Sequence, residues 1–320
     1  MNKNTVKNLI KSRVSLAPMA GITDYVLRSL IREESPNALL TTEMISSEFL
    51  TQTKEGDITK RDENHSPISY QLSGHKPKMI ADCAKYLEQY ADMIDINMGC
   101  PVNKVVKGTD GCALMRNPDL AEEIVRTVKA EISVPLSVKF RLGYTMDELN
   151  FVEFGELMQE AGADFITIHG RTRSQMYGGK ADWKKIAVLK HKVDIPVFAN
   201  GDVVSIESAV ECLEQSEADG VAIGRGALGD ITLINRIEKY LNEGIYIPPP
   251  TLEEKVEALK QHLLREVELR GENVGVKFVR KFYPYYLNGF QGASKLRGEI
   301  VLINSLDEVL KKLNSILCLG

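Results

Sequence analysis

One cysteine stands where a side chain could carry out acid–base or nucleophilic chemistry. Cys100 lies in the segment Asn97-Met98-Gly99-Cys100-Pro101, which follows the apolar run Met93–Ile96. A short strand that ends in Asn-x-Gly-Cys-Pro places the thiol on a tight turn at the carboxyl tip of the strand. A thiol held there can give or take a proton, or attack a substrate. The alternative is a small apolar residue buried in a turn, since free cysteine behaves as a small hydrophobe.

The other cysteines suggest neither a metal site nor a disulfide framework. The chain has five cysteines, an odd number, and no two of them form a C-x-x-C pair. This usage fits a reducing compartment. Cys112, the nearest to Cys100, precedes Ala113-Leu114-Met115 and is predicted to be a core residue. We therefore expect no bound metal and one chemically active thiol.

The elements that must position Cys100 alternate along the first 230 residues. Eight short runs are continuously apolar, as expected for parallel strands that are buried on both faces. The runs are 14–17, 38–42, 68–71, 93–97, 136–140, 165–169, 196–200 and 220–224. Amphipathic patterns predict helices at 78–90, 118–131, 150–161 and 205–215. Eight such units predict an α/β fold, a (β/α)8 TIM barrel. A doubly wound sheet is the alternative, and the even spacing favours closure.

Polar residues gather at the carboxyl ends of these runs. They are Ala17-Pro18-Met19, Gln71, Asn97, Lys139, Arg141, His169, Asn200-Gly201-Asp202 and Gly224-Arg225. In a barrel these ends converge on one mouth, where active sites are built, so the pattern predicts an enzyme. Lys139 would place a cation in the mouth, which suits the anionic edge of a reduced flavin. A solvated lysine and a structural histidine are the alternatives for Lys139 and His169.

A glycine-rich motif follows the last predicted strand. Residues 224–229, Gly-Arg-Gly-Ala-Leu-Gly, match G-x-G-x-x-G. A dinucleotide site is excluded, because that motif follows the first strand of its unit and is succeeded by a strand with a ribose-binding acid. Loops after strands seven and eight of a barrel commonly bind phosphate, and Arg225 adds a positive charge. Ordinary turn glycines are the alternative.

The composition changes at Tyr246-Ile247-Pro248-Pro249-Pro250, where three prolines form a stiff linker. Beyond it, helices are predicted at 252–270, 274–287, 293–303 and 306–317. We predict two domains, a catalytic barrel over 1–244 and an all-α helical domain over 245–320. The chain carries a net charge of −4, no run approaches a membrane span, and the first residues lack an apolar signal core. We expect a cytoplasmic protein without a membrane partner.

One side of the predicted helix 274–287 is basic. Lys277, Arg280 and Lys281 share this side, with Phe278 and Phe282 between and beside them. A basic face flanked by aromatic rings is typical of RNA contact. The alternative for the aromatic residues of this segment is packing in the core of the helical domain.

These segments together resemble the tRNA-dihydrouridine synthase family, whose members are FMN enzymes, and most of all its bacterial B-type branch. The matching segments occur in family order across nearly all of residues 14–230. They are Leu16-Ala17-Pro18-Met19-Ala20-Gly21-Ile22-Thr23-Asp24, Gln71-Leu72-Ser73-Gly74, Asp95-Ile96-Asn97-Met98-Gly99-Cys100-Pro101, Val138-Lys139-Phe140-Arg141-Leu142-Gly143, Ile168-His169-Gly170-Arg171-Thr172-Arg173, Ala199-Asn200-Gly201-Asp202 and Ile223-Gly224-Arg225-Gly226. The helical tail after a proline-rich linker also resembles that of the family.

The resemblance implies reduction of uridine to 5,6-dihydrouridine in the D loop of tRNA, with NADPH as the reductant. It implies that Cys100 is the general acid that protonates C5 of uracil, while flavin N5 delivers hydride to C6. The flavin-contacting positions it implies are Ala17, Pro18, Met19, Gln71, Lys139, His169, Asn200, Gly201, Asp202, Gly224 and Arg225. Asn97, Arg171 and Arg173 are the substrate contacts it suggests in the barrel. Lys277, Arg280 and Lys281 are the predicted tRNA contacts of the helical domain.

Two alternatives remain open. One is a flavin barrel that acts on a free pyrimidine such as dihydroorotate or a dihydropyrimidine. The helical tail and the segment His169–Arg173 argue against it. The other is a barrel that binds structured RNA as a chaperone, and the intact set of Cys100, Lys139 and Arg225 argues against a lost active site. We expect no obligatory protein partner.

Overall fold

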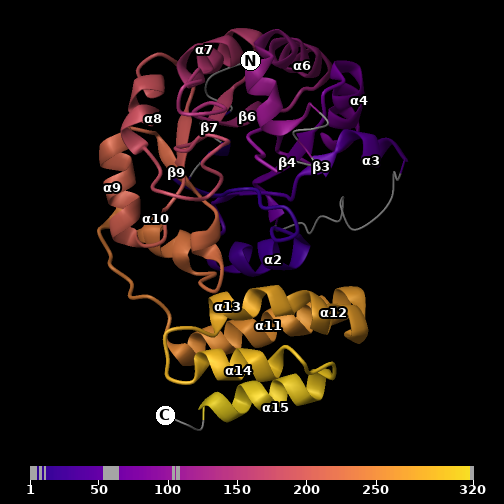
Figure 1. The fold of residues 1–320 in the computed structure, drawn as a ribbon, viewed down its shortest axis with the longest axis vertical. Helices are drawn as coiled ribbons and strands as arrows, with labels where there is room; N and C mark the ends of the chain where they lie inside the picture. Colours follow the sequence, from indigo (N-terminus) through magenta and orange to yellow (C-terminus); the bar gives the residue numbers. More distant parts are fainter. Residues whose placement is uncertain are drawn as a thin grey trace.

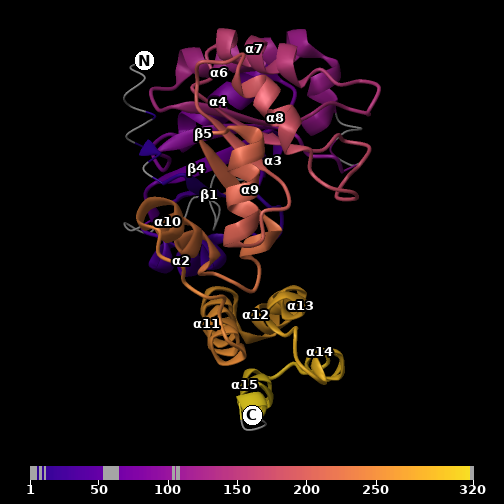
Figure 2. The same cartoon turned by 90° about the vertical axis from the view of Figure 1, so that its left-hand side faces the viewer.

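The computed structural model describes residues 6, 9–10, 12–52, 65–102, 105 and 109–317 of the chain (Figure 1). Its main body is a closed parallel barrel wrapped by helices, and a layer of helices lies below it (Figures 1 and 2). The predicted (β/α)8 barrel with a helical carboxyl-terminal region is confirmed. Among the described residues, no helix is long and apolar enough to cross a membrane.

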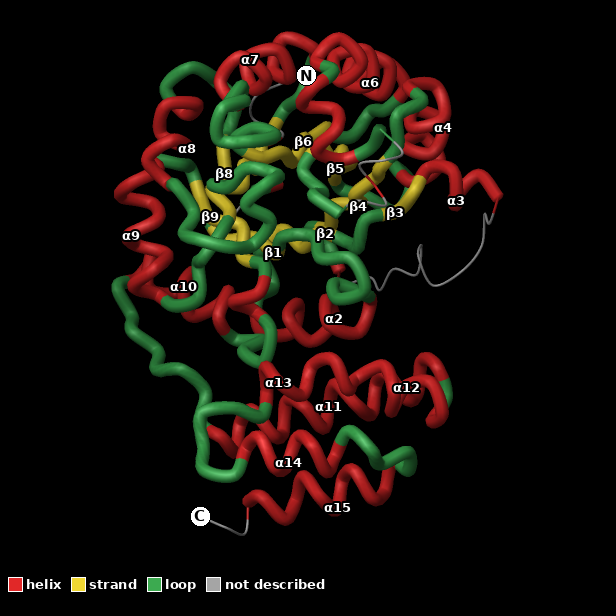
Figure 3. The backbone as a smooth tube through the Cα atoms, in the orientation of Figure 1, coloured by secondary structure: helices red, strands yellow, loops and turns green. Residues whose placement is uncertain are grey.

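Eight strands form the barrel, and all their pairings are parallel. They are β1 (Val14–Leu16), β2 (Leu39–Thr41), β4 (Ile68–Ser73), β5 (Met93–Met98), β6 (Leu136–Arg141), β7 (Phe165–His169), β8 (Val197–Asn200) and β9 (Gly220–Ile223). The ring closes where β1 pairs with β9 and where β2 pairs with β4 (Figure 3). A short strand that we did not predict, β3 (Ile45–Ser46), pairs with the carboxyl end of β4.

Helices cover the outside of the barrel. They are α2 (Tyr25–Glu34), α3 (Ser47–Gln52), α4 (Pro77–Leu87), α6 (Pro118–Glu131), α7 (Phe151–Ala161), α8 (Trp183–Lys190), α9 (Ile206–Ser216) and α10 (Leu233–Glu243), with 3-10 turns at η3 (Gly111–Arg116) and η4 (Arg225–Ala227). In α6, a proline begins the helix, and Ala121, Ile124, Val125 and Val128 recur at helical spacing and are buried. The predicted helix 118–131 therefore has the bounds that its pattern indicates.

The helical region begins after residues 244–251, which form no helix or strand. Its elements are α11 (Leu252–Arg270), α12 (Glu272–Val279), η5 (Arg280–Phe282), α13 (Tyr283–Tyr286), α14 (Ala293–Ile300) and α15 (Leu306–Leu317). The helix predicted over 274–287 is divided in the structure: residues 272–286 are helical, but the 3-10 turn η5 separates α12 from α13, and Pro284 has no backbone N–H to continue a regular helix. Phe282, Tyr283 and Tyr286 are buried, so these rings pack in the core.

The helical region rests on the α2 side of the barrel (Figure 2). The guanidinium of Arg265 in α11 makes two hydrogen bonds of 2.7 and 2.9 Å with the carboxylate of Glu33 in α2. Asp24, His262 and Glu266 are buried together between the two parts, where Arg270 donates to both carboxylates. These contacts join the barrel to the helical region. The division into a catalytic domain, 1–244, and a tRNA-binding domain, 245–320, stays a prediction.

Replacement of Gly220 tests the closure of the barrel. A Cβ at Gly220 would overlap the carbonyl oxygen of Arg13 and the ring of Phe198. We expect Gly220→Ala to lower the free energy of unfolding by about 1–3 kcal/mol, the usual cost of overpacking. In Gly298→Ala, the new Cβ has no neighbour within 4 Å and the residue lies inside α14. We expect this control to gain about 0.5–1 kcal/mol in urea unfolding. Equal effects of the two variants would contradict the packing argument.

Candidate active site

The predicted barrel residues all lie at the carboxyl end of the strands, around one mouth. Gln71, Asn97, Lys139, His169 and Asn200 lie within β4, β5, β6, β7 and β8. The loops that follow strands β1, β5, β8 and β9 carry Ala17, Pro18, Met19, Cys100, Gly201, Asp202, Gly224 and Arg225. Arg171 and Arg173 follow β7. The fold therefore brings together residues that are spread over some two hundred positions of sequence.

The Cys100 turn is held by four hydrogen bonds to its backbone. The side-chain oxygen of Asn97 accepts the amides of Gly99 and Cys100 at 3.2 and 2.9 Å. On the other side, the Arg141 Nε donates to the carbonyl oxygen of Gly99 at 2.8 Å, and the amide of Cys112 donates to the carbonyl oxygen of Cys100 at 3.1 Å. The position of the thiol is therefore fixed by the hydrogen bonds of its own backbone.

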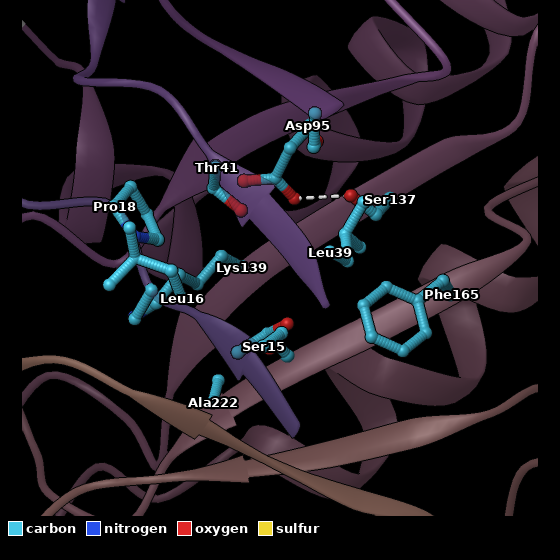
Figure 4. Close-up of a pocket in the computed structure, with 13 residues that line it drawn as sticks. Ser15, Leu16, Pro18, Leu39, Thr41, Asp95, Ser137, Lys139, Phe165 and Ala222 are labelled. Carbon is cyan, nitrogen blue, oxygen red and sulfur yellow. Dashed lines mark hydrogen bonds between the residues drawn. The ribbon is translucent and has the colours of Figure 1, made fainter. Parts of the chain in front are cut away.

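A chain of buried side chains orients the Asn97 amide. Ser137 Oγ donates to one oxygen of Asp95 at 2.5 Å (Figure 4). Gln71 Nε2 donates to the other oxygen at 2.6 Å. The amide nitrogen of Asn97 then donates to Gln71 Oε1 at 2.9 Å. Burial raises the pKa of Asp95, while the hydrogen bonds from Ser137 and Gln71 and the charge of Lys139 oppose that rise. Because both oxygens of Asp95 accept, its position fixes which end of each amide points where. The carboxylate inside the barrel thus sets the direction of every hydrogen bond up to the Cys100 turn.

A cavity of about 10 Å³ lies beside Asp95 inside the barrel, below the mouth. Thr41, Ser69, Ser137 and Lys139 are among the residues that line it (Figure 4). A space of this size holds about one water molecule. It is too small to accommodate a cofactor ring.

Both thiols near the mouth are protonated at neutral pH. Burial raises the pKa of the half-buried Cys100, and it raises the pKa of the fully buried Cys112 to about 12. Cys112 packs in the core, as its neighbours in sequence indicate. The exposed edge of Cys100 leaves it as the thiol that can meet a substrate and donate a proton.

Lys139 carries a positive charge that the protein does not neutralise by contact. Its side chain is partly buried, and it makes no hydrogen bond or ion pair with any residue that the structure describes. Burial and the positive charge of the nearby Arg141 together lower the pKa of Lys139 to about 8, while Asp95 opposes the shift. An unpartnered ammonium beside the Cys100 turn is suited to an anionic ligand.

The imidazole of His169 is neutral. Burial, together with the positive charges of Arg141 and Lys139, holds the pKa of His169 well below 6.5. Its Nε2 lies 3.3 Å from Arg171 Nη1. Because a guanidinium only donates, Nε2 is the acceptor and Nδ1 carries the proton. His169 can therefore donate one hydrogen bond from Nδ1 without adding charge to the mouth.

The loops after β8 and β9 form the other end of the mouth. Asn200 donates to the carbonyl oxygen of Ala222 at 2.7 Å and so ties the two strand ends together. Gly201 has φ +116°, and a Cβ there would lie 2.9 Å from the His169 ring, so only glycine fits. Trp183 donates its indole N–H to the Gly201 carbonyl at 3.0 Å. Arg225 is half exposed, with a 3.7 Å ion pair to Asp202 as its charge contact.

Arg171, a predicted substrate contact, is buried in the loops after β7 and β8, and that role stays a prediction. Its guanidinium donates to Asp202 at 2.7 and 2.8 Å and to the Gly178 and Gly179 carbonyls. Arg171 therefore positions the loops. Arg173 lies nearer the rim, 5.2 Å from the Tyr144 ring centre.

The three predicted contacts of the helical domain also separate. Lys277 is exposed on α12. Arg280 donates to the Ile303 carbonyl at 3.0 Å and to Asn304 Oδ1 at 2.8 Å, within its own domain. Lys281 donates to the carbonyl of Gly21 in the barrel. The three residues share one side of the segment, but only Lys281 bonds to the barrel, whereas Arg280 bonds within its own domain and Lys277 is exposed.

The sequence analysis did not assign roles to Asp95 or Tyr144. An acidic residue between Ile94 and Ile96 in a buried strand was the available signal for Asp95. Tyr144 lies under the guanidinium of Arg116 at 3.5 Å and beside Arg173. No sequence pattern indicates that stack, because Arg116 lies on η3, far away along the chain.

The residues present fit a flavin with a phosphate. The unpartnered ammonium of Lys139 suits the N1/O2 edge. Asn97 lies opposite Lys139 on the neighbouring strand and is hydrogen-bonded to the amide of Gln71. Arg225 with the glycine-shaped loops suits a phosphate. The fold and this mouth define a (β/α)8-barrel enzyme with its site at the strand ends. Comparison with known proteins identifies the family.

A family model described as "Dihydrouridine synthase (Dus)" matches residues 15–318. "Probable tRNA-dihydrouridine synthase 1" of Synechocystis sp. is 42% identical, over 93% of this chain and 84% of that protein. "tRNA-dihydrouridine synthase B" of Pseudomonas aeruginosa is 36% identical, over 93% and 90%. The chain belongs to the dihydrouridine synthase family, which confirms the predicted family and enzyme class.

Two solved structures share the fold. A 2-naphthoyl-CoA reductase in complex with 2-naphthoyl-CoA superposes with a TM-score of 0.56 at 11% identity, over 74% of this chain and 52% of that one. An old yellow enzyme homologue from Zymomonas mobilis superposes with a TM-score of 0.50 at 13% identity, over 77% and 92%. At these identities the likeness concerns the barrel architecture.

Variants of Asp95 test the hydrogen-bond chain. Asp95→Ala leaves the Gln71 amide N–H without its buried acceptor, so we expect about 1–3 kcal/mol of lost stability. We also expect faster amide hydrogen exchange at Gly99 and Cys100. Asp95→Asn keeps an oxygen toward Gln71, and the Ser137 hydroxyl can accept from its amide, so it should retain most of the order. Unchanged exchange in Asp95→Ala would show that the turn does not depend on Asp95.

Proposed function

We propose that this protein reduces uridines in the D loop of tRNA to 5,6-dihydrouridine, with FMN as cofactor and NADPH as electron donor. The observation that carries the proposal is a protonated Cys100, fixed by its backbone, beside the unpartnered ammonium of Lys139. Membership in the dihydrouridine synthase family and the names of the relatives support tRNA as the substrate.

The cofactor would be held along the mouth by residues of all the strand ends described above. Lys139 would pair with the N1/O2 edge, Gln71 and Asn97 would hydrogen-bond to the ring, and Ala17, Pro18 and Met19 would line it. His169, Asn200, Gly201, Asp202, Gly224 and Arg225 would hold the phosphate end and the chain that leads to it. When bound and reduced, FMN supplies the hydride for C6 of the uracil ring.

Cys100 supplies the second half of the addition. Saturation of the C5=C6 bond requires a hydride at C6 and a proton at C5. The thiol gives its proton to C5 and is left as a thiolate, which takes a proton from solvent before the next turnover. Overall, one NADPH and one proton are consumed for each dihydrouridine formed. The raised pKa keeps Cys100 in the protonated form that this role requires.

The target base must leave the folded tRNA to reach the mouth, as in other enzymes that act on bases. Asn97 lies between the Gln71 amide and the Cys100 turn, where it can contact both the ring of the cofactor and the base. Arg173 with Tyr144 at the rim, and Lys277 on α12, are the groups we propose for the RNA backbone. The D loop as target rests on family membership alone.

Replacement of Cys100 tests the general acid. We expect Cys100→Ala to keep the bound flavin and the tRNA affinity while single-turnover dihydrouridine formation falls by about 10²–10⁴-fold. Cys112→Ala, which changes the buried neighbouring thiol, should retain activity.

Mass-spectrometric mapping of dihydrouridine in tRNA from cells with and without the gene provides the substrate test. Turnover of free uracil or dihydroorotate without tRNA turnover would replace the proposal by the free-pyrimidine alternative.

The pKa of Lys139 predicts a pH dependence of cofactor binding. Lys139 is charged below about pH 8 and loses its charge above it, so the affinity of the apo-protein for FMN should fall as pH rises from 7.5 through about 8 and beyond. The check is a fluorescence titration with FMN at several pH values. Lys139→Met should bind FMN more weakly, with little change across the same range. A parallel decline in Lys139→Met would assign the effect to another group.

A further inference from the structure

We propose that the helical domain positions the loop Met19–Asp24 at the mouth of the barrel, and that Lys281 is the positioning residue. The inference rests on the proposed flavin site, because this loop continues directly from Ala17 and Pro18. It gives the helical domain a role toward the cofactor in addition to any contact with RNA.

Residues 19–23 form a compact, hydrogen-bonded turn, so a displacement of one of them moves the others. The amides of Ile22 and Thr23 both donate to the carbonyl of Met19 at 3.0 Å, and the Met19 amide donates to Thr23 Oγ1 at 3.0 Å. Met19 in turn faces the loop after β9, where a Cβ on Gly224 would lie 3.6 Å from its sulfur. A shift of Gly21 therefore moves Met19 against the proposed phosphate end of the site.

Lys281 crosses from the helical domain to this turn. Its Nζ donates to the Gly21 carbonyl, while the Gly21 amide donates to Glu43 Oε1 of the barrel at 2.5 Å. Nζ also lies 3.1 Å from the centre of the Phe278 ring and 5.1 Å from that of Phe282. These cation–π contacts fix Lys281 on its own domain, so its reach to Gly21 is set by where the domain docks.

A second contact holds the other end of the loop. Arg270 donates to Asp24 Oδ2 at 2.9 Å, and Asp24 Oδ1 accepts the amide of Leu27 at the start of α2 at 3.0 Å. The loop after β9 is also pressed against the helical domain, since a Cβ at Gly229 would overlap the backbone of Tyr285. Two loops that border the mouth are therefore in contact with this domain.

Lys277 offers a matched comparison one turn earlier on the same segment. It is exposed and makes no hydrogen bond or ion pair with any described residue, whereas Lys281 is partly buried and bonded to the barrel. Of the two lysines, Lys277 is the one whose charge is free to meet a phosphate. If the domain that holds RNA also holds the flavin loop, binding of either ligand changes the affinity for the other by the same factor.

The experiment separates positioning from RNA contact by titrating apo-protein with FMN, without tRNA, for wild type and three variants. We expect Lys281→Met to weaken FMN affinity by about fivefold to tenfold and to speed amide hydrogen exchange in residues 19–24. Lys281→Arg, which keeps a cation on the two rings, should restore both. Lys277→Met should leave FMN affinity and exchange unchanged and weaken tRNA binding.

Wild-type FMN affinity and exchange in Lys281→Met would overturn the inference, whatever its tRNA affinity. If Lys281→Met does not fold, Glu43→Gln, which weakens the hold on Gly21 from the barrel side, should produce the same loosening of residues 19–24, and unchanged exchange there would overturn it. If wild-type protein binds no FMN, the proposed function fails, and the exchange comparison still decides whether Lys281 holds the loop.

Discussion

The site depends on one carboxylate in the interior of the barrel. Both oxygens of Asp95 accept hydrogen bonds, one from Ser137 and one from Gln71. That choice forces the Gln71 carbonyl toward Asn97 and the Asn97 carbonyl toward the Cys100 turn. A buried polar chain of this kind is costly if any member lacks a partner, and it is rigid when all are satisfied. Because the last member of this chain, Asn97, accepts the Cys100 amide, the Cys100 turn is held rigidly as well.

Positively charged side chains are concentrated around the mouth. Lys139, Arg141, Arg171 and Arg225 lie on neighbouring strand ends, although the whole chain has a net charge of −4. Arg141 and Arg171 are engaged by backbone carbonyls and Asp202, so they serve as supports, and Lys139 is left for a ligand. The crowding of cations also keeps His169 neutral. The mouth is therefore locally positive within an acidic protein.

Much of the barrel could be predicted because the local sequence pattern indicates which strands are buried and where each strand ends. Continuous apolar runs gave the eight strands, and polar residues at their ends gave Gln71, Asn97 and Lys139 their places. What could not be predicted depends on contacts between distant segments. The direction of Lys281, the burial of Arg171 and the partners of Asp95 are set by which loops pack together, and no local pattern carries that information. Pro284, by contrast, is a local signal in the sequence for the interruption between α12 and α13.

The pairing of β1 with β9 has a consequence for how the chain is made. Val14 pairs with Val221, so the first strand to leave the ribosome lacks its neighbour on that side until the last strand has been synthesised. The turn after β1 and the loop after β9 are also two of the places that the helical region contacts. The helical region, which is synthesised after the barrel, therefore contacts the loops on both sides of this seam. Nascent chains that end before it would expose a seam closed by short strands alone.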